Sequence, residues 1–143
     1  VANYKVKNPS KYKGDPTNVI SRSSWETRFM VYLDKTKNVL EWSSEEIRIP
    51  YVSPIDGRKR VYFPDFFVRM INKEGIKETL IVEVKPLNQT TAPVKKSRVT
   101  KKYLNEVKTW GINKSKWDAA YKYCEDRGWK FTIFTEKELG IKY

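Results

Sequence analysis

The sequence contains no histidine, and this absence excludes several kinds of active site. Ser–His triads, histidine general bases and histidine-ligated metal sites all need the imidazole ring. Cysteine is nearly absent as well: Cys124 stands alone, so no internal disulfide and no paired-cysteine zinc motif can form. A reducing cytoplasm is compatible with this composition. Hydrolytic chemistry in this chain must therefore use carboxylates, lysine, water and a hard metal ion.

Long apolar runs are also missing. The longest ones are a few residues, whereas a membrane-spanning helix needs about 20, and no apolar signal segment opens the sequence. We therefore expect a soluble protein with no membrane partner. The length of 143 residues fits a single domain, which buries roughly two-thirds of the surface that its unfolded chain exposes.

Acidic residues are scarce relative to basic ones, and the imbalance is local. The chain has 29 Lys and Arg against 17 Asp and Glu, a formal net charge of +12. Residues 1–22 contribute +4 and residues 85–116 contribute +8, while the rest is balanced. A solvated surface would spread its lysines, so this clustering favours a polyanion-binding surface, which we assign to DNA. The candidate DNA-binding residues are Lys95, Lys96, Arg98, Lys101, Lys102, Lys108, Lys114 and Lys116.

The first 22 residues have no sustained hydrophobic period, and we interpret 1–22 as a basic N-terminal arm and 23–143 as one folded domain. Ser23 and Glu26 have the spacing of a capping box, and Trp25, Phe29 and Leu33 follow at steps of four. This pattern predicts a helix that begins after Ser23 and ends within 34–37.

Strand-like segments follow, separated by residues typical of turns. The turn over 53–57 predicts one hairpin, and the turn over 72–75 predicts a second, whose strands hold residues 60–70 and 79–85. Two further helices are expected, a basic one that stops near Gly111 and another that opens at 115–118 and is capped by Gly128. A final strand over 129–135 and a short helix capped by Thr135 and Glu138 complete the pattern. This order predicts an α/β (α+β) domain with a mixed sheet flanked by helices.

Pro64-Asp65 precedes Glu83-Val84-Lys85 by 17 intervening residues, on the two strands of the second predicted hairpin. Side chains two apart share one face of a strand, so Glu83 and Lys85 project together while Val84 points to the other face. If Asp65 lies opposite Glu83, two carboxylates and an ammonium group converge. Paired carboxylates suit Mg²⁺, with Mn²⁺ as an alternative, and the ion would activate water against a phosphodiester.

Each of these residues also has a purely structural interpretation. Glu83 and Lys85 would form a solvated ion pair worth under about 1 kcal/mol, and Asp65 would be a turn residue. Glu26 is a helix cap in one interpretation and reaches the outer shell of the metal in the other, and the two are not exclusive.

Glu26, Pro64-Asp65 and Glu83-Val84-Lys85 together resemble the helix glutamate and the PD-(D/E)xK motif of the restriction-endonuclease-like superfamily. Segments 8–12, 22–26, 62–66 and 116–120 are similar to the head-completion nucleases of T-even-type tailed phages, and that likeness runs nearly end to end. The nuclease subunit that cuts transposon ends is similar in the nuclease core alone.

The resemblance implies a restriction-endonuclease-like fold and catalytic residues Glu26, Asp65, Glu83 and Lys85, with Asp65 and Glu83 as ligands of Mg²⁺. It implies a virion protein, made in the host cytoplasm, that acts on packaged DNA or its end, with phage head, portal or neck proteins as partners. Two other hypotheses remain open: a non-catalytic plug that binds the DNA end, and a nuclease subunit of a transposition or recombination complex.

Overall fold

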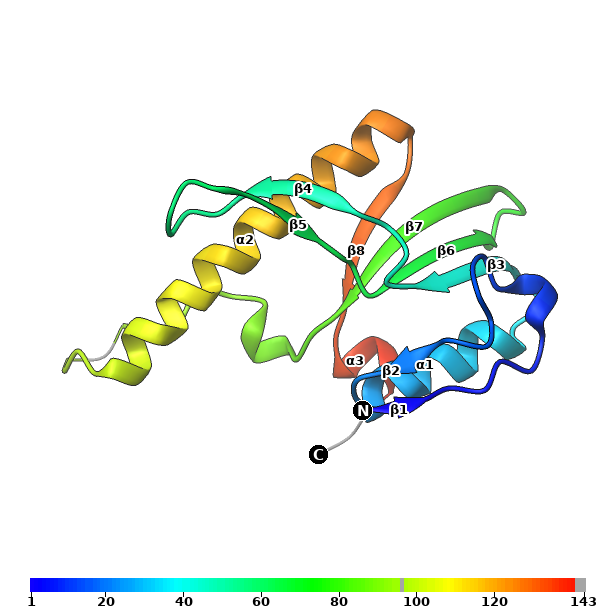
Figure 1. Cartoon of the computed structure of the whole chain (residues 1–143), viewed down its shortest axis with the longest axis horizontal. Helices are drawn as coiled ribbons and strands as arrows, with labels where there is room; N and C mark the ends of the chain where they lie inside the picture. Colours follow the sequence, from blue (N-terminus) through cyan, green and yellow to red (C-terminus); the bar gives the residue numbers. More distant parts are fainter. Residues whose placement is uncertain (96, 141–143) are drawn as a thin grey trace.

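A four-stranded mixed sheet runs through the middle of the domain, with helices on both sides (Figure 1). The computed structural model describes residues 1–95 and 97–140. Its elements, in chain order, are β1 (Ala2–Asn3), the 3₁₀ turn η1 (Pro9–Lys11), β2 (Ile20–Ser21), α1 (Ser24–Lys35), β3 (Val39–Ser44), β4 (Ile49–Val52), β5 (Lys59–Tyr62), β6 (Phe66–Ile71), β7 (Lys77–Val84), the 3₁₀ turn η2 (Leu87–Gln89), α2 (Lys101–Arg127), β8 (Lys130–Phe134) and α3 (Glu136–Leu139). The predicted α/β class with a mixed sheet is confirmed.

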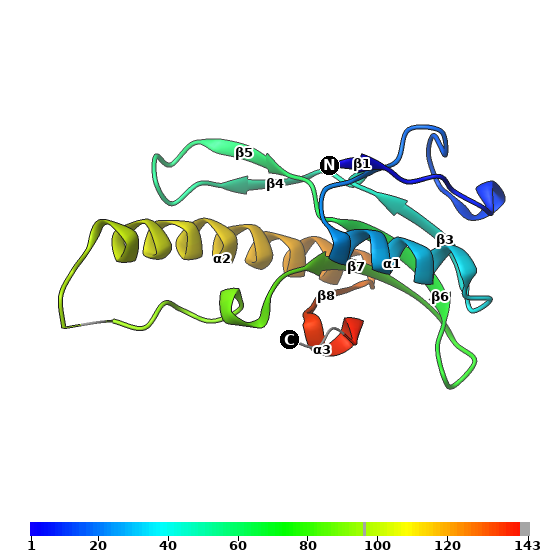
Figure 2. The same ribbon diagram turned by 90° about the horizontal axis from the view of Figure 1, so that it is seen from below.

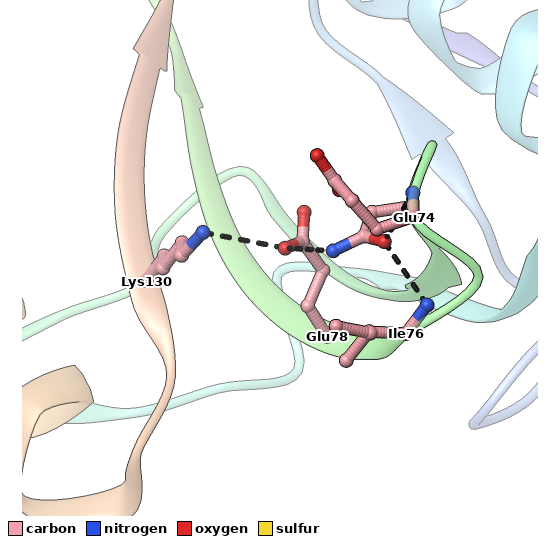
Figure 3. A network of polar contacts seen from close by, with 5 residues as sticks. Glu74, Ile76, Glu78 and Lys130 are labelled. Carbon is pink, nitrogen blue, oxygen red and sulfur yellow. Dashed lines mark hydrogen bonds and ion pairs between the residues drawn. The ribbon is translucent and has the colours of Figure 1, made fainter.

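The sheet has the order β3-β6-β7-β8, and only the pair β7–β8 is parallel. The predicted hairpin around residues 72–75 is confirmed as β6–β7. Its turn is fixed by the side chain of Asn72, whose Oδ1 accepts the backbone N–H groups of Glu74 and Ile76, each at 3.0 Å. Figure 3 shows that Glu78 continues this network to Lys130 on β8, with 3.3 Å between Oε2 and Nζ. These contacts join the N-terminal ends of β7 and β8.

Apolar side chains alternate along the strands and build one core on each face of the sheet. On one face, Phe29 and Leu33 of α1 pack with Trp42 and Val82. On the other face, Ile81 lies in a second cluster with Trp117 of α2. Figure 1 shows α1 and α3 on one side of the sheet and α2 on the other, and Figure 2 shows α2 running alongside β4 and β5. Because β7 is covered on both faces, Val82 on one face and Glu83 on the other are both buried.

Helix α1 begins where the capping pattern predicts. The Ser23 hydroxyl accepts the backbone N–H of Glu26 at 3.1 Å, and the helix ends at Lys35. The second half of the expected capping box is absent, because the Glu26 carboxylate accepts the backbone N–H of Arg22 at 3.0 Å. The short terminal helix α3, by contrast, has the complete box between Thr135 and Glu138.

Helix α2 corrects one prediction. We expected two helices separated near Gly111, whereas residues 101–127 form one helix of 27 residues capped by Gly128. A glycine inside a helix costs about 1 kcal/mol relative to alanine, and tertiary packing offsets that cost here. The rings of Trp110 and Trp117 pack edge to face with centroids 5.9 Å apart on either side of Gly111. Within the described ranges, no helix is both long enough and apolar enough to cross a membrane.

The strands around the turn over 53–57 pair as predicted, but β4 and β5 form a separate ribbon rather than part of the main sheet. The inward side chains of this ribbon, including Ile49 and Tyr62, join the α2 core. Pro64 separates β5 from β6, because a proline cannot donate a ladder hydrogen bond. The ribbon therefore leaves the sheet at the residue before Asp65.

The first 22 residues pack along α1 and the sheet. Tyr12 and Val19 are buried in the core, and Lys11 donates to the carbonyl groups of Leu33 and Thr36, each at 2.8 Å, at the end of α1. The boundary between arm and domain at residue 22 stays a prediction.

Candidate active site

Asp65 and Glu83 meet at the end of the β6–β7 hairpin. The register that pairs Phe66 with Val82 brings Asp65, the preceding residue, beside Glu83 and Val84. The backbone N–H of Val84 donates to Asp65 Oδ2 at 2.8 Å, which fixes the carboxylate toward the end of β7. The convergence that the sequence predicts for these two carboxylates is therefore present in the structure.

Two side chains contact the Glu83 carboxylate, one at each oxygen atom. The Tyr62 hydroxyl donates to Oε1 at 2.6 Å, and Lys85 Nζ lies 3.8 Å from Oε2. Glu83 and Tyr62 are 7% and 4% exposed, so this hydrogen bond is shielded from water, whereas the Lys85 side chain is 27% exposed. Lys85 thus sits between the buried carboxylate and solvent.

Glu26 lies on the first turn of α1 and is 7% exposed. Burial raises the pKa of its carboxyl group, and Asp65 is close enough to act on the same pKa. The structure therefore brings Glu26, Asp65, Glu83 and Lys85 into one neighbourhood. Glu26 also caps the entry to α1 through Arg22, so both interpretations of this residue stay open.

The carboxyl groups of the site carry unusual pKa values. Burial, reinforced by the negative charge of Glu83, raises the pKa of Asp65 to about 8. Burial also raises the pKa of Glu83, although the Tyr62 hydrogen bond and Lys85 oppose this shift. Desolvation penalises the charged carboxylates, and the nearby cations Lys85, Lys116 and Arg22 do not cancel this penalty. Such an arrangement gains free energy from an added cation.

The donor set suits a hard divalent metal. Oxygen ligands and one or two carboxylates are what Mg²⁺ takes from proteins, with water or phosphate oxygens in its remaining positions. Across residues 1–95 and 97–140, no group of three or more Asp, Glu, Cys or His side chains is placed to hold a metal ion. Asp65 and Glu83, whose charges act on each other, are the candidate ligand pair, and Glu26 lies beside Asp65.

The basic residues of the predicted DNA surface extend away from this site. Lys101, Lys102 and Lys108 project from the N-terminal half of α2, and Lys95 and Arg98 lie exposed in the preceding loop. At 100° per residue, these three helix lysines and Lys116 fall within about a third of the helix circumference. Lys96 lies outside the described residues.

Two of the predicted DNA-binding lysines have other contacts. Lys114 forms an ion pair with Asp118, with 3.5 Å between Nζ and Oδ2. Lys116 Nζ lies over the rings of Tyr51 and Tyr62, 5.9 and 5.7 Å from their centroids, and its charge also acts on the pKa of Glu83. Lys116 thus belongs to the surroundings of Glu83.

Sequence reasoning missed Tyr62 and the pair Arg22–Glu45. Glu45 donates its backbone N–H to the Asp65 carbonyl at 3.1 Å, and its side chain accepts from Arg22 Nε at 2.9 Å. Among the residues described, Glu45 is the one non-glycine residue with positive φ, at 54°. Backbone strain of this kind gathers at functional sites. The alternation of β5 was the available signal for Tyr62, because it places Tyr62 on the side opposite the exposed Val61.

Comparison with known proteins gives two matches. Residues 36–136 match the family described as TnsA-like endonuclease N terminal. The chain is also 41% identical to the head completion nuclease of Enterobacteria phage T4 over 143 aligned residues, which cover 95% of this chain and 93% of that protein. No solved structure matches. Asp65, Glu83 and Lys85 lie inside the family match, and Glu26 precedes it.

Proposed function

The chain belongs to the family of TnsA-like endonucleases, and we propose that it is the head-completion nuclease of a tailed phage. Asp65, Glu83 and Lys85 are its proposed catalytic residues. Its activity is that of an endonuclease that works with a divalent metal. The observation that carries the assignment to these residues is the position of Asp65 beside the buried Glu83, whose carboxylate lies 3.8 Å from the partly exposed Lys85 ammonium group at the end of β7.

Asp65 and Glu83 would hold Mg²⁺, with Mn²⁺ as an alternative. When bound, the ion supplies Lewis-acid polarisation of the scissile phosphate and lowers the pKa of a water molecule. Tyr62 and the Val84 amide fix the orientation of the two carboxylates through their hydrogen bonds. The Lys85 side chain is partly exposed beside Glu83. Its ammonium group would orient the attacking water or stabilise the charge that develops on the phosphate.

The lysines of α2 and of the loop before it would bind the phosphate backbone beside the site. Contacts of this kind provide affinity without reading the sequence. Since the proposed contacts of these lysines all go to phosphates, we propose cutting with little base preference.

The phage relative, a head completion nuclease, supports a proposal for the biological setting. We place the protein in the virion and, before assembly, in the host cytoplasm, where it acts on packaged DNA or its end. Head, portal or neck proteins would be its partners.

The proposal is tested by incubating the purified protein with supercoiled plasmid and with linear duplex, in Mg²⁺ and in EDTA, beside the Asp65→Asn variant. Nicking or linearisation that needs Mg²⁺ and is lost in the variant is the expected result. A protein that binds DNA but cuts neither substrate would act as a structural plug. Cutting that appears only with an added recombination partner would point to a subunit of a transposition complex.

A further inference from the structure

The β4–β5 ribbon has one face buried and one face open to solvent. Ile49, Tyr51 and Tyr62 point inward and pack with α2. The outward side chains, by contrast, include Val52 and Val61, which are 55% and 43% exposed although both lie within strands. Exposed valines on a formed strand leave apolar area in water, and such patches mark binding surfaces.

The segment that forms the ribbon is also basic. Residues 47–64 contain four Arg and Lys against one acid, Asp56, which is paired with Arg60. Within the described part of the chain, Arg58 and Lys59 form no ion pair, and Lys59 stands opposite Val52 across the ribbon. The net charge of the sequence does not reveal this cluster, because the basic and acidic residues of 23–84 are equal in number.

The ribbon is held rigidly. Its tip is closed by hydrogen bonds from the Ser53 amide to the Arg58 carbonyl and from the Gly57 amide to the Ser53 carbonyl, both at 2.9 Å. The ring of Pro54 rests on α2, where a methyl group added to Gly111 would meet it at 3.9 Å. A ribbon fixed along its inner face presents its outer face with little further loss of backbone conformational entropy on binding.

The C-terminal end of the ribbon lies at the active site. Its last residue, Tyr62, donates to Glu83, and Asp65 follows three residues later. Figure 1 shows the ribbon running from this junction toward the same end of the molecule as the N-terminal half of α2. At about 3.4 Å per residue, Arg58 lies roughly 14 Å along the strand from Tyr62, a distance of about four base pairs of duplex.

We propose that the β4–β5 ribbon is a second DNA-binding element, which enters a groove of the duplex on one side of the cut. The major groove admits a two-stranded β-ribbon. Val52 and Val61 would contact apolar base and sugar atoms, while Arg58 and Lys59 bind the flanking phosphates. This inference rests on the proposed function, since it takes DNA as the substrate.

The first test measures binding of a fluorescent 30-base-pair duplex in EDTA, where no cutting occurs, as a function of salt. Arg58→Gln/Lys59→Gln should lower the slope of log K against log salt by nearly two, since each phosphate contact contributes about 0.9. The control is Lys73→Gln/Lys77→Gln, which removes the same charge from two exposed lysines at the β6–β7 turn, at the opposite end of the molecule. Equal slopes for the two variants would overturn the proposal.

The second test locates the ribbon on DNA. Cys124 is buried, and burial raises the pKa of its thiol to about 11, so a cysteine introduced by Ile55→Cys can be labelled alone. A photoreactive group attached there should crosslink to the duplex about four or more base pairs from the cut, while Lys73→Cys should give no crosslink. No crosslink from either position would refute a ribbon on DNA.

Failure of the ribbon and failure of the proposed function are distinguishable. If the wild type does not cut DNA in Mg²⁺, the proposed function fails, while the binding tests in EDTA still report on the ribbon. If the ribbon variant binds DNA like the control but loses the ability to support infectious particles, the outer face binds an acidic protein instead, and the proposal is wrong.

Discussion

The hydrogen bond between Tyr62 and Glu83 allows a quantitative test through Tyr62→Phe. This change removes one hydroxyl oxygen and leaves the ring packed against α2. The bond is 2.6 Å long and joins two side chains that are 4% and 7% exposed. A hydrogen bond to a charged group contributes about 1.5–3 kcal/mol, and solvent does not replace the lost donor at a buried site. We expect the free energy of unfolding to fall by that amount while Glu83 is ionised.

The same variant should also slow cutting. If the bond serves to orient Glu83 in the transition state, a loss of about 1.5–3 kcal/mol corresponds to roughly a 10- to 100-fold lower kcat. KM for DNA should stay unchanged, because Tyr62 is buried. Urea denaturation measures the first effect and single-turnover cleavage of plasmid the second.

Tyr51→Phe is the matched control. Tyr51 is 9% exposed, lies in the same core cluster, and also lies under Lys116. Its hydroxyl forms no hydrogen bond among the described residues, so its removal tests the loss of an oxygen alone. Equal stability and equal kcat in the two variants would refute the positioning role of Tyr62.

Three further outcomes follow from the site. Asp65→Asn and Glu83→Gln should each abolish cutting in Mg²⁺ while circular dichroism shows an intact fold, and wild-type activity in either would contradict the ligand pair. Lys85→Met should keep DNA affinity but lose about 10²- to 10³-fold in rate, and full rescue of infectious particles by this variant would remove Lys85 from catalysis. The raised pKa of Asp65, about 8, means that the folded metal-free protein retains a proton that the unfolded chain releases from about pH 4 upward. The Tm of the metal-free protein should therefore fall as pH rises from 5 to 8, and added Mg²⁺ should raise the Tm more at pH 8 than at pH 5. A Tm independent of pH in EDTA would show that Asp65 is already ionised.

The parts of the fold that local chemistry determines were predicted from the sequence. The turn at Asn72 sets the register of the β6–β7 hairpin, and that register brings Asp65 to Glu83. Thr135 and Glu138 form their capping box within a single turn. In each case the deciding contacts join residues close in sequence, so spacing alone is informative.

The parts that escaped prediction depend on contacts between distant segments. Gly111 predicts a helix end, because glycine is a poor helix former. In the structure α2 is continuous, and Trp110 packs against Trp117 across this position. Tyr62 and Glu83 are 21 positions apart and come from two different sheets. The alternation of β5 indicates that Tyr62 faces inward, but no local pattern indicates that the ribbon packs on α2 and brings Tyr62 to Glu83.

The parallel pairing of β7 with β8 has a consequence for the order in which the enzyme acquires its activity. β7 carries Glu83. Directly after this strand, the Lys85 amide donates to the Phe134 carbonyl at 2.9 Å, across nearly 50 positions of the chain. Pairings of such long range form late, because loop closure must come first. A nascent chain that still lacks β8 would hold Glu83 on an unsupported edge, and newly made protein would be harmless to nucleic acid until its last strand docks. Pulse-labelled hydrogen exchange at Lys85, whose amide donates to Phe134 of β8, should therefore show protection only when the amides of β8 are protected as well.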